Sequence, residues 1–497
     1  MNHQISRREF MKVTGAAAMG VTMANGAVAQ QAGATTKRNI VFIFIDDLRY
    51  DGLGMLDPYF KTPALDSLAQ NGILFDRAFV TTSLCSPSRA SVLSGQYAHV
   101  HGVMDNGTLM PEGTPTFPVE LQKAGYKTAF IGKWHMGGST DEPRPGFDRW
   151  VSFRGQGVYY NPTFNIDGEK VSLEGYTTDL LTGYAEEFLD GLTDDEPFML
   201  YLSHKAVHGD FYPAERHKGA YDGRLYPRPA SMANTDENYA GKPEWVRDQR
   251  QSWHGVDGMY NKRIDFDTFT QDYAETLLAV DESVARVVEA LRKAGKLDST
   301  LLVFTSDNGF QFGEHGLIDK RTMYEASIRV PLIVHCPELI RGGQRRHEMI
   351  LNIDFAPTFL DAGGTPIPDS VQGRSFYGLL TGEQKQWRDA WLYEYFWERS
   401  FAQTPTVLGV RTDRYKLMQF HGVWDRYELY DLENDPDEMH NLLADFMVEN
   451  EAGTLDNLIM RQAKGDVKKV FNDMRGKLTQ LLRETGCAQE PNWQPWR

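Results

Sequence analysis

The fold and the chemistry of this chain depend on the stretch Ser83-Leu84-Cys85-Ser86-Pro87-Ser88-Arg89-Ala90-Ser91. Pro87 suits the first turn of a helix, where its missing N–H would have no partner, and Ser86 can cap the free donors of that turn. We therefore expect Cys85 just outside a helix N-terminus, where unpaired N–H groups and the helix dipole attract anions. Arg89 would add a bidentate contact to a tetrahedral anion. The pattern favours Cys85 as a nucleophile, but a small buried residue before a capped helix fits it equally well.

The composition is that of an ordinary acidic globular protein. The 497 residues are 41% hydrophobic and 24% charged, and this length suggests two or more domains. The formal net charge of −16 argues against nucleic acid or an anionic membrane as a partner, whereas cations gathered in a cleft can still bind an anionic substrate. The three cysteines, Cys85, Cys336 and Cys487, are too few for a disulfide framework or a thiolate zinc site. A bridge between Cys336 and Cys487 stays open, although two unpaired thiols are the simpler interpretation.

The first 29 residues have the pattern of an export signal. Ser6-Arg7-Arg8-Glu9-Phe10-Met11-Lys12 precedes a mildly apolar run over residues 13–24, and Ala27-Val28-Ala29 follows. This looks like a twin-arginine signal, so we expect a mature chain that begins near Gln30, periplasmic or secreted, with the twin-arginine export machinery as a partner. The apolar run is too short to span a bilayer and no other segment is long and apolar enough, so we predict no membrane span.

Oxygen-bearing side chains follow two predicted strands. Residues 39–45 form a continuous apolar run that ends at Asp46-Asp47, and residues 301–305 form another that ends at Ser306-Asp307-Asn308-Gly309. The carboxyl ends of such strands are where open α/β sheets bind ligands, and adjacent carboxylates repel each other unless a cation lies between them. Oxygen ligands without sulfur or imidazole suit a hard cation, and calcium tolerates irregular geometry better than magnesium. Solvated loop acids are the alternative interpretation of the first pair.

Reactive side chains also follow two further predicted strands. Lys133 and His135 come after the strand predicted over residues 126–131, and side chains two apart in an extended segment project the same way. His204 and His208 come after the buried strand predicted over residues 198–202. A surface lysine beside a packed tryptophan would also explain the first pair, but repeated reactive groups at strand ends favour one shared site.

The order of predicted elements indicates an α/β fold. Strands and helices alternate to about residue 380, which predicts a mostly parallel sheet wrapped by helices, including an amphipathic helix over residues 272–294. Short strands then follow at residues 391–395, 407–411, 415–420 and 427–432, and a helix at residues 470–484. We therefore predict a catalytic domain over residues 30–385 and a C-terminal subdomain over residues 386–497, built from an antiparallel sheet and a helix.

Together these motifs resemble the type I, formylglycine-dependent sulfatases. Residues 85–89 match the Cys-x-Pro-x-Arg signature of that family, and the other motifs occur in the family's order: paired acids, Gly-Lys-Trp-His at residues 132–135, a later histidine, Asp-Asn-Gly at residues 307–309, and a lysine before Tyr-Glu. The resemblance implies an alkaline-phosphatase-like fold and a sulfuric ester hydrolase. It also implies conversion of Cys85 to formylglycine by a formylglycine-generating enzyme, before twin-arginine export because that route carries folded proteins. Calcium would be bound by Asp46, Asp47, residue 85, Asp307 and Asn308.

The resemblance also implies a role for each catalytic side chain. A hydrated formylglycine would attack sulfur, with Arg89 and Lys133 holding the hydrate and the sulfate. His208 and Lys320 would protonate or polarise the leaving oxygen, and His135 would take a proton from the second hydroxyl so that the aldehyde reforms. The choice of His208 is open, because His204 lies four residues earlier and the proline that often flanks the family's histidine is missing.

The substrate that the resemblance implies is a sulfated carbohydrate. Residues 84–91, 99–106 and 318–325 look most like N-acetylglucosamine-6-sulfatases and related polysaccharide sulfatases, so we expect a glycosaminoglycan or algal-type fragment. Residues 209–267, rich in Tyr, Trp and Arg, would serve substrate recognition or simple packing. Two other functions stay open. One is a phosphonate or phosphate diester hydrolase of the same superfamily, and the other is a non-catalytic, calcium-bound glycan-binding protein in which Cys85 is unmodified.

Overall fold

The computed structural model describes residues 37–193, 196–423, 427–446 and 465–487. The predicted export signal over residues 1–29 lies outside these ranges. Within them, no helix combines the length and the apolar character that crossing a bilayer requires. Cys336 forms no disulfide in the described residues, so the structure does not contain a bridge between Cys336 and Cys487.

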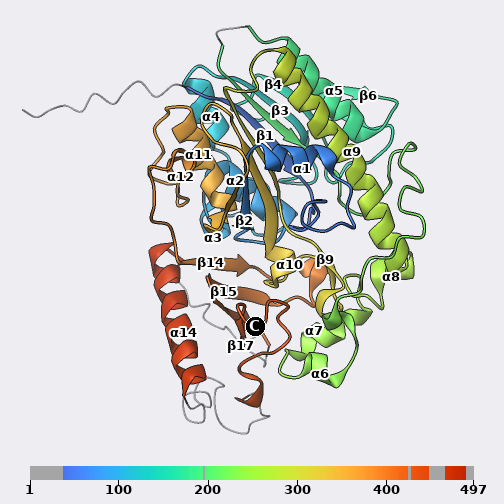
Figure 1. The fold of residues 1–497 in the computed structure, drawn as a ribbon, viewed down its shortest axis with the longest axis vertical. Helices are drawn as coiled ribbons and strands as arrows, with labels where there is room; N and C mark the ends of the chain where they lie inside the picture. The colour runs from blue at the N-terminus through green and yellow to red at the C-terminus, as the bar shows by residue number, and fades with distance from the viewer. Residues whose placement is uncertain (1–36, 194–195, 424–426, 447–464, 488–497) are drawn as a thin grey trace, which may run out of the picture. The chain divides into compact units, whose positions relative to one another are not determined.

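A large sheet lies at the centre of the fold (Figure 1). In the described residues its order is β12 (Gln344–Arg346), β2 (Ile73–Phe79), β11 (Arg329–His335), β8 (Thr300–Ser306), β1 (Asn39–Ile45), β7 (Phe198–Ser203), β3 (Lys127–Lys133), β4 (Arg149–Phe153), β5 (Thr163–Ile166) and β6 (Glu169–Ser172), with β13 (Ile350–Leu351) beside β2. Strand β1 pairs in parallel with β7 and β8, and β3 pairs in parallel with β7 and β4, whereas β11 runs antiparallel between β8 and β2. This is the mostly parallel sheet that the sequence predicts.

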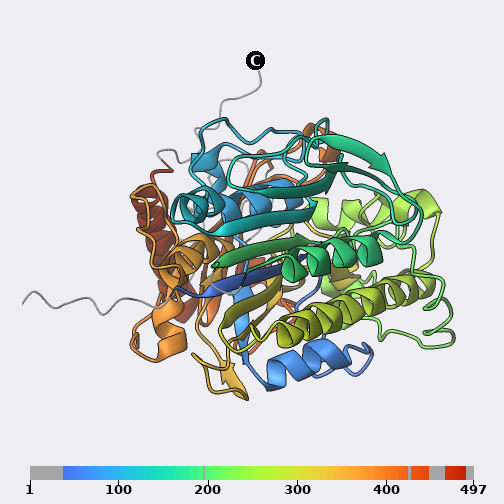
Figure 2. The same cartoon turned by 90° about the horizontal axis from the view of Figure 1, so that it is seen from above.

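Helices cover both faces of the sheet, which explains why β1 is apolar and buried from Ile40 to Ile45. Side chains of a strand alternate between faces, so Val41 and Ile43 enter one hydrophobic cluster while Ile40 and Phe42 enter another. The first cluster includes side chains of α1 (Pro63–Gln70), α5 (Thr177–Asp190) and α9 (Phe266–Lys293), and the second those of α2 (Cys85–Ser94), α4 (Phe117–Lys123) and α11 (Phe355–Ala362). In Figure 2 the blue α1 and the yellow-green α9 lie on the same side of the sheet.

Helix α9 begins six residues before the predicted start. Asp265 caps it, because its side chain accepts hydrogen bonds from the backbone N–H groups of Asp267 and Thr268. The preceding segment, predicted as a long loop, contains three short helices. These are α6 (Asp236–Tyr239), α7 (Glu244–Asp248) and α8 (Met259–Lys262).

The C-terminal elements form the antiparallel sheet that the turn pattern predicts. It is built from β14 (Ala390–Tyr395), β15 (Thr406–Thr412), β16 (Tyr415–His421) and β17 (Tyr427–Asp431), and α14 (Asp466–Glu484) packs on it with Phe471 and Leu478 (Figure 1). The division between domains after residue 385 stays a prediction.

One glycine allows the carboxyl ends of two strands to meet. Gly132, in β3, has φ +126° and pairs with Ser203 of β7, and a Cβ atom there would lie 1.7 Å from the Ser203 carbonyl oxygen. Only glycine adopts this conformation and this approach without strain. The next residue, Lys133, is thereby held at the end of the sheet, beside Ser203 and Arg89.

Candidate active site

The predicted site residues meet at one edge of the sheet. Asp46 and Asp47 follow β1, and Asp307 and Asn308 follow β8, its parallel neighbour, in which Ser306 pairs with Ile45. Carboxylate oxygens of Asp46, Asp47 and Asp307 lie within 4.8 Å of one another, and all three residues are buried. Adjacent parallel strands therefore place the acids together, as their positions in the sequence predict.

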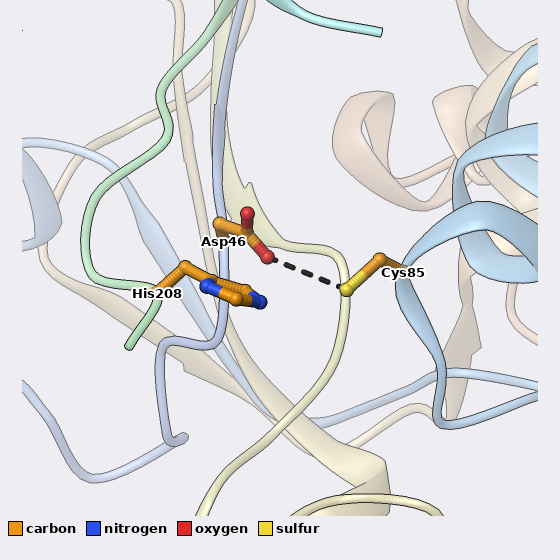
Figure 3. A group of neighbouring side chains, drawn as sticks. All are labelled: Asp46, Cys85 and His208. Carbon is orange, nitrogen blue, oxygen red and sulfur yellow. Dashed lines mark hydrogen bonds between the residues drawn. The ribbon is translucent and has the colours of Figure 1, made fainter. Parts of the chain in front are cut away.

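Cys85 lies beside these acids at the start of α2. Its thiol donates to Asp46 Oδ1 at 3.6 Å, and Figure 3 shows the thiol and the His208 ring both turned toward the Asp46 carboxylate. Burial raises the pKa of the Cys85 thiol far above its usual value, so the unmodified side chain stays protonated. A buried neutral thiol is a poor nucleophile, which agrees with a role that requires its chemical conversion.

The helix starts two residues earlier than a cap at Ser86 predicts. Cys85 is the first residue of α2, Leu84 precedes it as the N-cap residue, and Pro87 is third in the helix. Ser86 does not cap the helix, because its hydroxyl donates to the backbone oxygen of His135. Instead the Ser86 N–H donates to Asn106 Oδ1 at 3.0 Å, so a side chain distant in sequence replaces the local cap.

The acidic cluster has the character of a cation site. Burial, together with repulsion by Asp46, raises the pKa of Asp47 to about 7 despite the neighbouring Lys320, and burial likewise raises the pKa of Asp307. The buried Asn308 Oδ1 accepts no hydrogen bond from any described residue. Oxygen donors alone, one of them without a partner, fit a hard divalent cation such as calcium.

Three cations hold the acids in place. Lys133 pairs with Asp46 and Lys320 pairs with Asp47, while Arg89 contacts Asp307 Oδ2 through Nε at 2.9 Å and through Nη2 at 2.8 Å. Although burial alone would raise it, the Lys133 ammonium holds the pKa of Asp46 well below its usual value. Arg89 Nη1 also donates to the Lys133 carbonyl oxygen and to Ser203 Oγ, both at 2.8 Å. Arg89 thus fixes the geometry of the cluster as well as adding charge.

The structure separates the two candidate histidines. His208 Nε2 lies 3.9 Å from Asp47 Oδ2, and a ring nitrogen of His208 lies within 4.8 Å of Asp46 and Cys85 ligand atoms. His204 Nε2 instead lies 2.9 Å from Ser283 Oγ on α9, and burial lowers the pKa of His204 to about 3. His208 faces the site and His204 packs against a helix, which favours the assignment of His208.

His135 contacts the residue that follows Cys85 in the chain. Its Nδ1 is 3.4 Å from the hydroxyl of Ser86, the residue after Cys85. Burial, together with the nearby Lys133 charge, lowers the pKa of His135 well below its usual value. A neutral imidazole in this position is able to accept a proton.

The sequence did not predict several contacts that the structure shows at the site. Lys133 donates to Gln156 Oε1, Lys320 lies 3.4 Å from Asp319 Oδ1, and Asp319 Oδ2 lies 2.8 Å from His254 Nε2. Asp319 could have been found from its position beside Lys320. Gln156 lies in a turn after β4 and carries no local signal of its role.

In the aromatic segment over residues 209–267, some side chains pack against other residues and others are exposed. Tyr226 packs edge-on against Phe312 with ring centroids 5.0 Å apart, and Arg250 pairs with Asp257. Tyr212 and Trp253 are 55% and 36% exposed, so they are the members free to contact a ligand. The packing interpretation therefore holds for part of the segment.

Comparison with known proteins agrees with this geometry. A sequence model of the sulfatase family matches residues 38–365, and one described as N-sulphoglucosamine sulphohydrolase, C-terminal, matches residues 313–464. The chain is 35% identical to N-acetylglucosamine-6-O-sulfatase of Bacteroides thetaiotaomicron over 82% of this chain and 83% of that protein. It is 33% identical to human N-acetylglucosamine-6-sulfatase over 76% of this chain and 70% of that protein.

A solved structure has the same fold. That protein, in complex with its substrate D-glucosamine-2-N,6-O-disulfate, superimposes with a TM-score of 0.82 at 30% identity, over 92% of this chain and 100% of its own. The sheet order and this superposition confirm the predicted alkaline-phosphatase-like fold with its C-terminal antiparallel sheet. Because the family match spans well over half of the chain, the protein belongs to the sulfatase family and is a sulfatase enzyme.

Proposed function

We propose that this sulfatase hydrolyses the 6-O-sulfate ester of a glucosamine-type residue in a sulfated carbohydrate. The observation that carries the proposal is the position of Cys85, at the start of a helix and beside three buried carboxylates and their cations. Support for the substrate comes from two relatives named as N-acetylglucosamine-6-sulfatases and from the related complex with a glucosamine disulfate.

The proposed chemistry divides among the residues at the sheet edge. Conversion of the Cys85 thiol to a hydrated aldehyde would place a hydroxyl there, and calcium held by Asp46, Asp47, Asp307 and Asn308 would supply a Lewis acid that stabilises negative charge on oxygen. Lys133, beside Asp46, has its ammonium placed to donate to sulfate oxygens.

The remaining side chains would donate or accept protons. The buried Lys320, whose pKa its carboxylate neighbours hold well above the usual value against the effect of burial, stays protonated and can donate to the leaving oxygen. Burial, with Lys133 next, lowers the pKa of His208, and an anionic ester beside the ring would raise that pKa and favour proton donation. The neutral His135 would accept the proton that is released when the aldehyde reforms.

The proposal includes maturation and export. A formylglycine-generating enzyme would convert Cys85 in the cytoplasm, and the twin-arginine machinery would then carry the folded protein to the periplasm or beyond. Polymer degradation outside the cytoplasm suits a large anionic substrate that does not cross membranes unaided.

The substrate proposal is tested with matched esters. Wild-type protein is expected to release sulfate from N-acetylglucosamine-6-O-sulfate and from 6-sulfated glycosaminoglycan oligosaccharides, measured as free sulfate by ion chromatography. Nitrophenyl sulfate and nitrophenyl phosphonate serve as comparison substrates. Activity on aryl sulfate alone would reject the carbohydrate proposal, and faster turnover of the phosphonate would favour the diester hydrolase alternative.

Removing calcium is expected to lower both activity and stability. The three carboxylates lose the cation that offsets their repulsion, and saturating calcium should add about 2 to 4 kcal/mol to the free energy of unfolding when it exceeds Kd by about 100- to 1,000-fold. The melting temperature with chelator and with added calcium measures the effect. Asn308→Ala should weaken the calcium response, because it removes the oxygen that has no partner among the described residues.

A second carboxylate variant serves as the control for that experiment. Asp281 accepts hydrogen bonds from Ala64 and Leu65 N–H groups at the start of α1, away from the acidic cluster. Asp281→Asn should therefore melt at a lower temperature while keeping the full response to calcium. An unchanged melting temperature of wild-type protein after chelation would contradict the calcium assignment.

A further inference from the structure

A buried lysine three residues before His208 has no part in the chemistry described above. Lys205 is 4% exposed and lies in the turn that joins β7 to His208, in which the His208 N–H donates to the Lys205 carbonyl oxygen at 3.1 Å. The charged neighbours that act on its ammonium include Lys133, Asp46 and Asp47. Lys205 therefore lies at the active site, on the side of His208.

The ammonium of Lys205 lacks an anionic partner. Among the described residues it makes neither a hydrogen bond nor an ion pair, and its nearest recorded neighbour is the ring of Tyr159, whose centroid lies 4.4 Å away. A cation–π contact contributes less than the cost of burying an ammonium without a counter-ion. The tyrosine ring alone does not offset this cost, so the position favours binding of an anion.

The nearby carboxylates are already paired. Asp46 contacts Lys133, Asp47 contacts Lys320, and Asp307 contacts Arg89. Two further acids, Asp319 and Asp210, pair with Arg321 at 3.0 Å and with Arg263 at 3.5 Å. Lys205 is a further cation, and a bound divalent ion would add more positive charge. Since one sulfate monoester brings a single negative charge, the site has positive charge left for a second anionic group.

The position of Lys205 indicates which part of the substrate it would meet. The Tyr159 hydroxyl donates to the His208 carbonyl oxygen at 2.6 Å, so the ring beneath Lys205 is fixed to the segment that carries the leaving-group histidine. Under the proposed role of His208, the sugar would leave on that side of the site. Burial, reinforced by repulsion from Lys133, lowers the pKa of Lys205 to about 8, and a neighbouring anion would raise it again.

We propose that Lys205 binds a second anionic group of the substrate, a sulfate or a carboxylate, on the sugar that bears the scissile ester or on the sugar next to it. The proposal rests on the proposed function, because it assumes that a sugar occupies the leaving-group side. Its consequence is a preference for carbohydrates that carry two negative charges close together over those that carry one.

The test measures binding without turnover. The Cys85→Ala protein, with calcium, is titrated calorimetrically with three ligands: N-acetylglucosamine-6-O-sulfate, glucosamine-2-N,6-O-disulfate, and a 6-sulfated disaccharide with a neighbouring uronate. Adding Lys205→Met is expected to weaken binding of one of the two dianionic ligands about 10- to 100-fold, the loss of one charged hydrogen bond, while changing the monoanionic ligand less than about 2-fold. The ligand that is weakened identifies the group as a second sulfate or a carboxylate.

Two further variants control for charge and for folding. Lys205→Arg keeps the charge and should retain most of the preference, and Lys127→Met removes an exposed lysine from the opposite end of β3 and should change nothing. Lys205→Met replaces a buried charge with an apolar chain, so its melting temperature should not fall. Equal loss for all three ligands, no loss for any, or no measurable binding of either dianionic ligand would each overturn the proposal.

These results can be distinguished from failure of the proposed function. If wild-type protein released no sulfate from any of the three ligands, the desulfation proposal would fail. The ratio of binding constants in the Cys85→Ala background would still decide whether Lys205 selects dianionic carbohydrates.

Discussion

Cys85→Ala protein is expected to release sulfate no faster than background, a loss on the order of 10⁴- to 10⁶-fold in kcat. The side chain of residue 85 is the proposed source of the attacking oxygen, and the thiol that lies 3.6 Å from Asp46 Oδ1 is the atom to be replaced. Alanine removes that atom and leaves the acids and their cations in place. Sulfate release from N-acetylglucosamine-6-O-sulfate, measured at saturating substrate, gives the loss directly.

Mass spectrometry of the peptide that contains Cys85 tests the same assignment without a mutation. Conversion to the aldehyde replaces one sulfur and two hydrogens with one oxygen, and active wild-type protein should contain this form. The Cys336→Ala protein is the matched control, because Cys336 is a buried free thiol that contacts the Asp298 carbonyl oxygen and none of the site residues. Full activity in a sample that contains only the thiol at residue 85 would refute the nucleophile assignment, whereas inactive thiol protein that still binds calcium and glycan would favour the non-catalytic alternative.

The sheet and the acids of the site are predictable from the sequence because they depend on local pattern, whereas the catalytic roles are inferred from the family resemblance. Continuous apolar runs such as residues 39–45 indicate strands covered on both faces, and the carboxyl ends of parallel strands meet at one edge. Asp46, Asp47, Asp307 and Asn308 therefore converge although more than 250 residues separate the two pairs. The periodicity of α9 likewise predicts its position, and only its start, set by the Asp265 cap, is missed.

The parts that the sequence does not reveal depend on partners far apart in the chain. Asn106 accepts from the Ser86 N–H and so takes the capping role that Ser86 was expected to have, and Gln156 accepts from Lys133 without any motif to mark it. In the aromatic segment, Tyr226 packs against Phe312, which decides its role although its composition would also suit a sugar. Lys205 shows the same limit, because a lysine is recognised as lacking a counter-ion only when all its neighbours are known.

The two histidines after β7 should respond to substitution in opposite ways. His208→Ala is expected to lower kcat on a sugar sulfate by about 10²- to 10⁴-fold, because the alkoxide that leaves needs a proton. The loss should be much smaller with nitrophenyl sulfate, whose phenolate leaves without protonation. His208 is the histidine that lies 3.9 Å from Asp47, so the contrast between these two substrates tests its role as an acid and not only its presence in the site.

His204→Ala should instead affect stability. Its imidazole is buried beside Ser283 Oγ, which also accepts a hydrogen bond from Thr182. Alanine therefore leaves a cavity between β7 and α9, and the Ser283 hydroxyl loses its contact with the imidazole. The expected result is a free energy of unfolding lower by about 1 to 3 kcal/mol with kcat nearly unchanged on both substrates. Turnover abolished in the His204 variant and retained in the His208 variant would show that the leaving-group acid is His204, and that the segment between residues 203 and 208 rearranges when substrate binds.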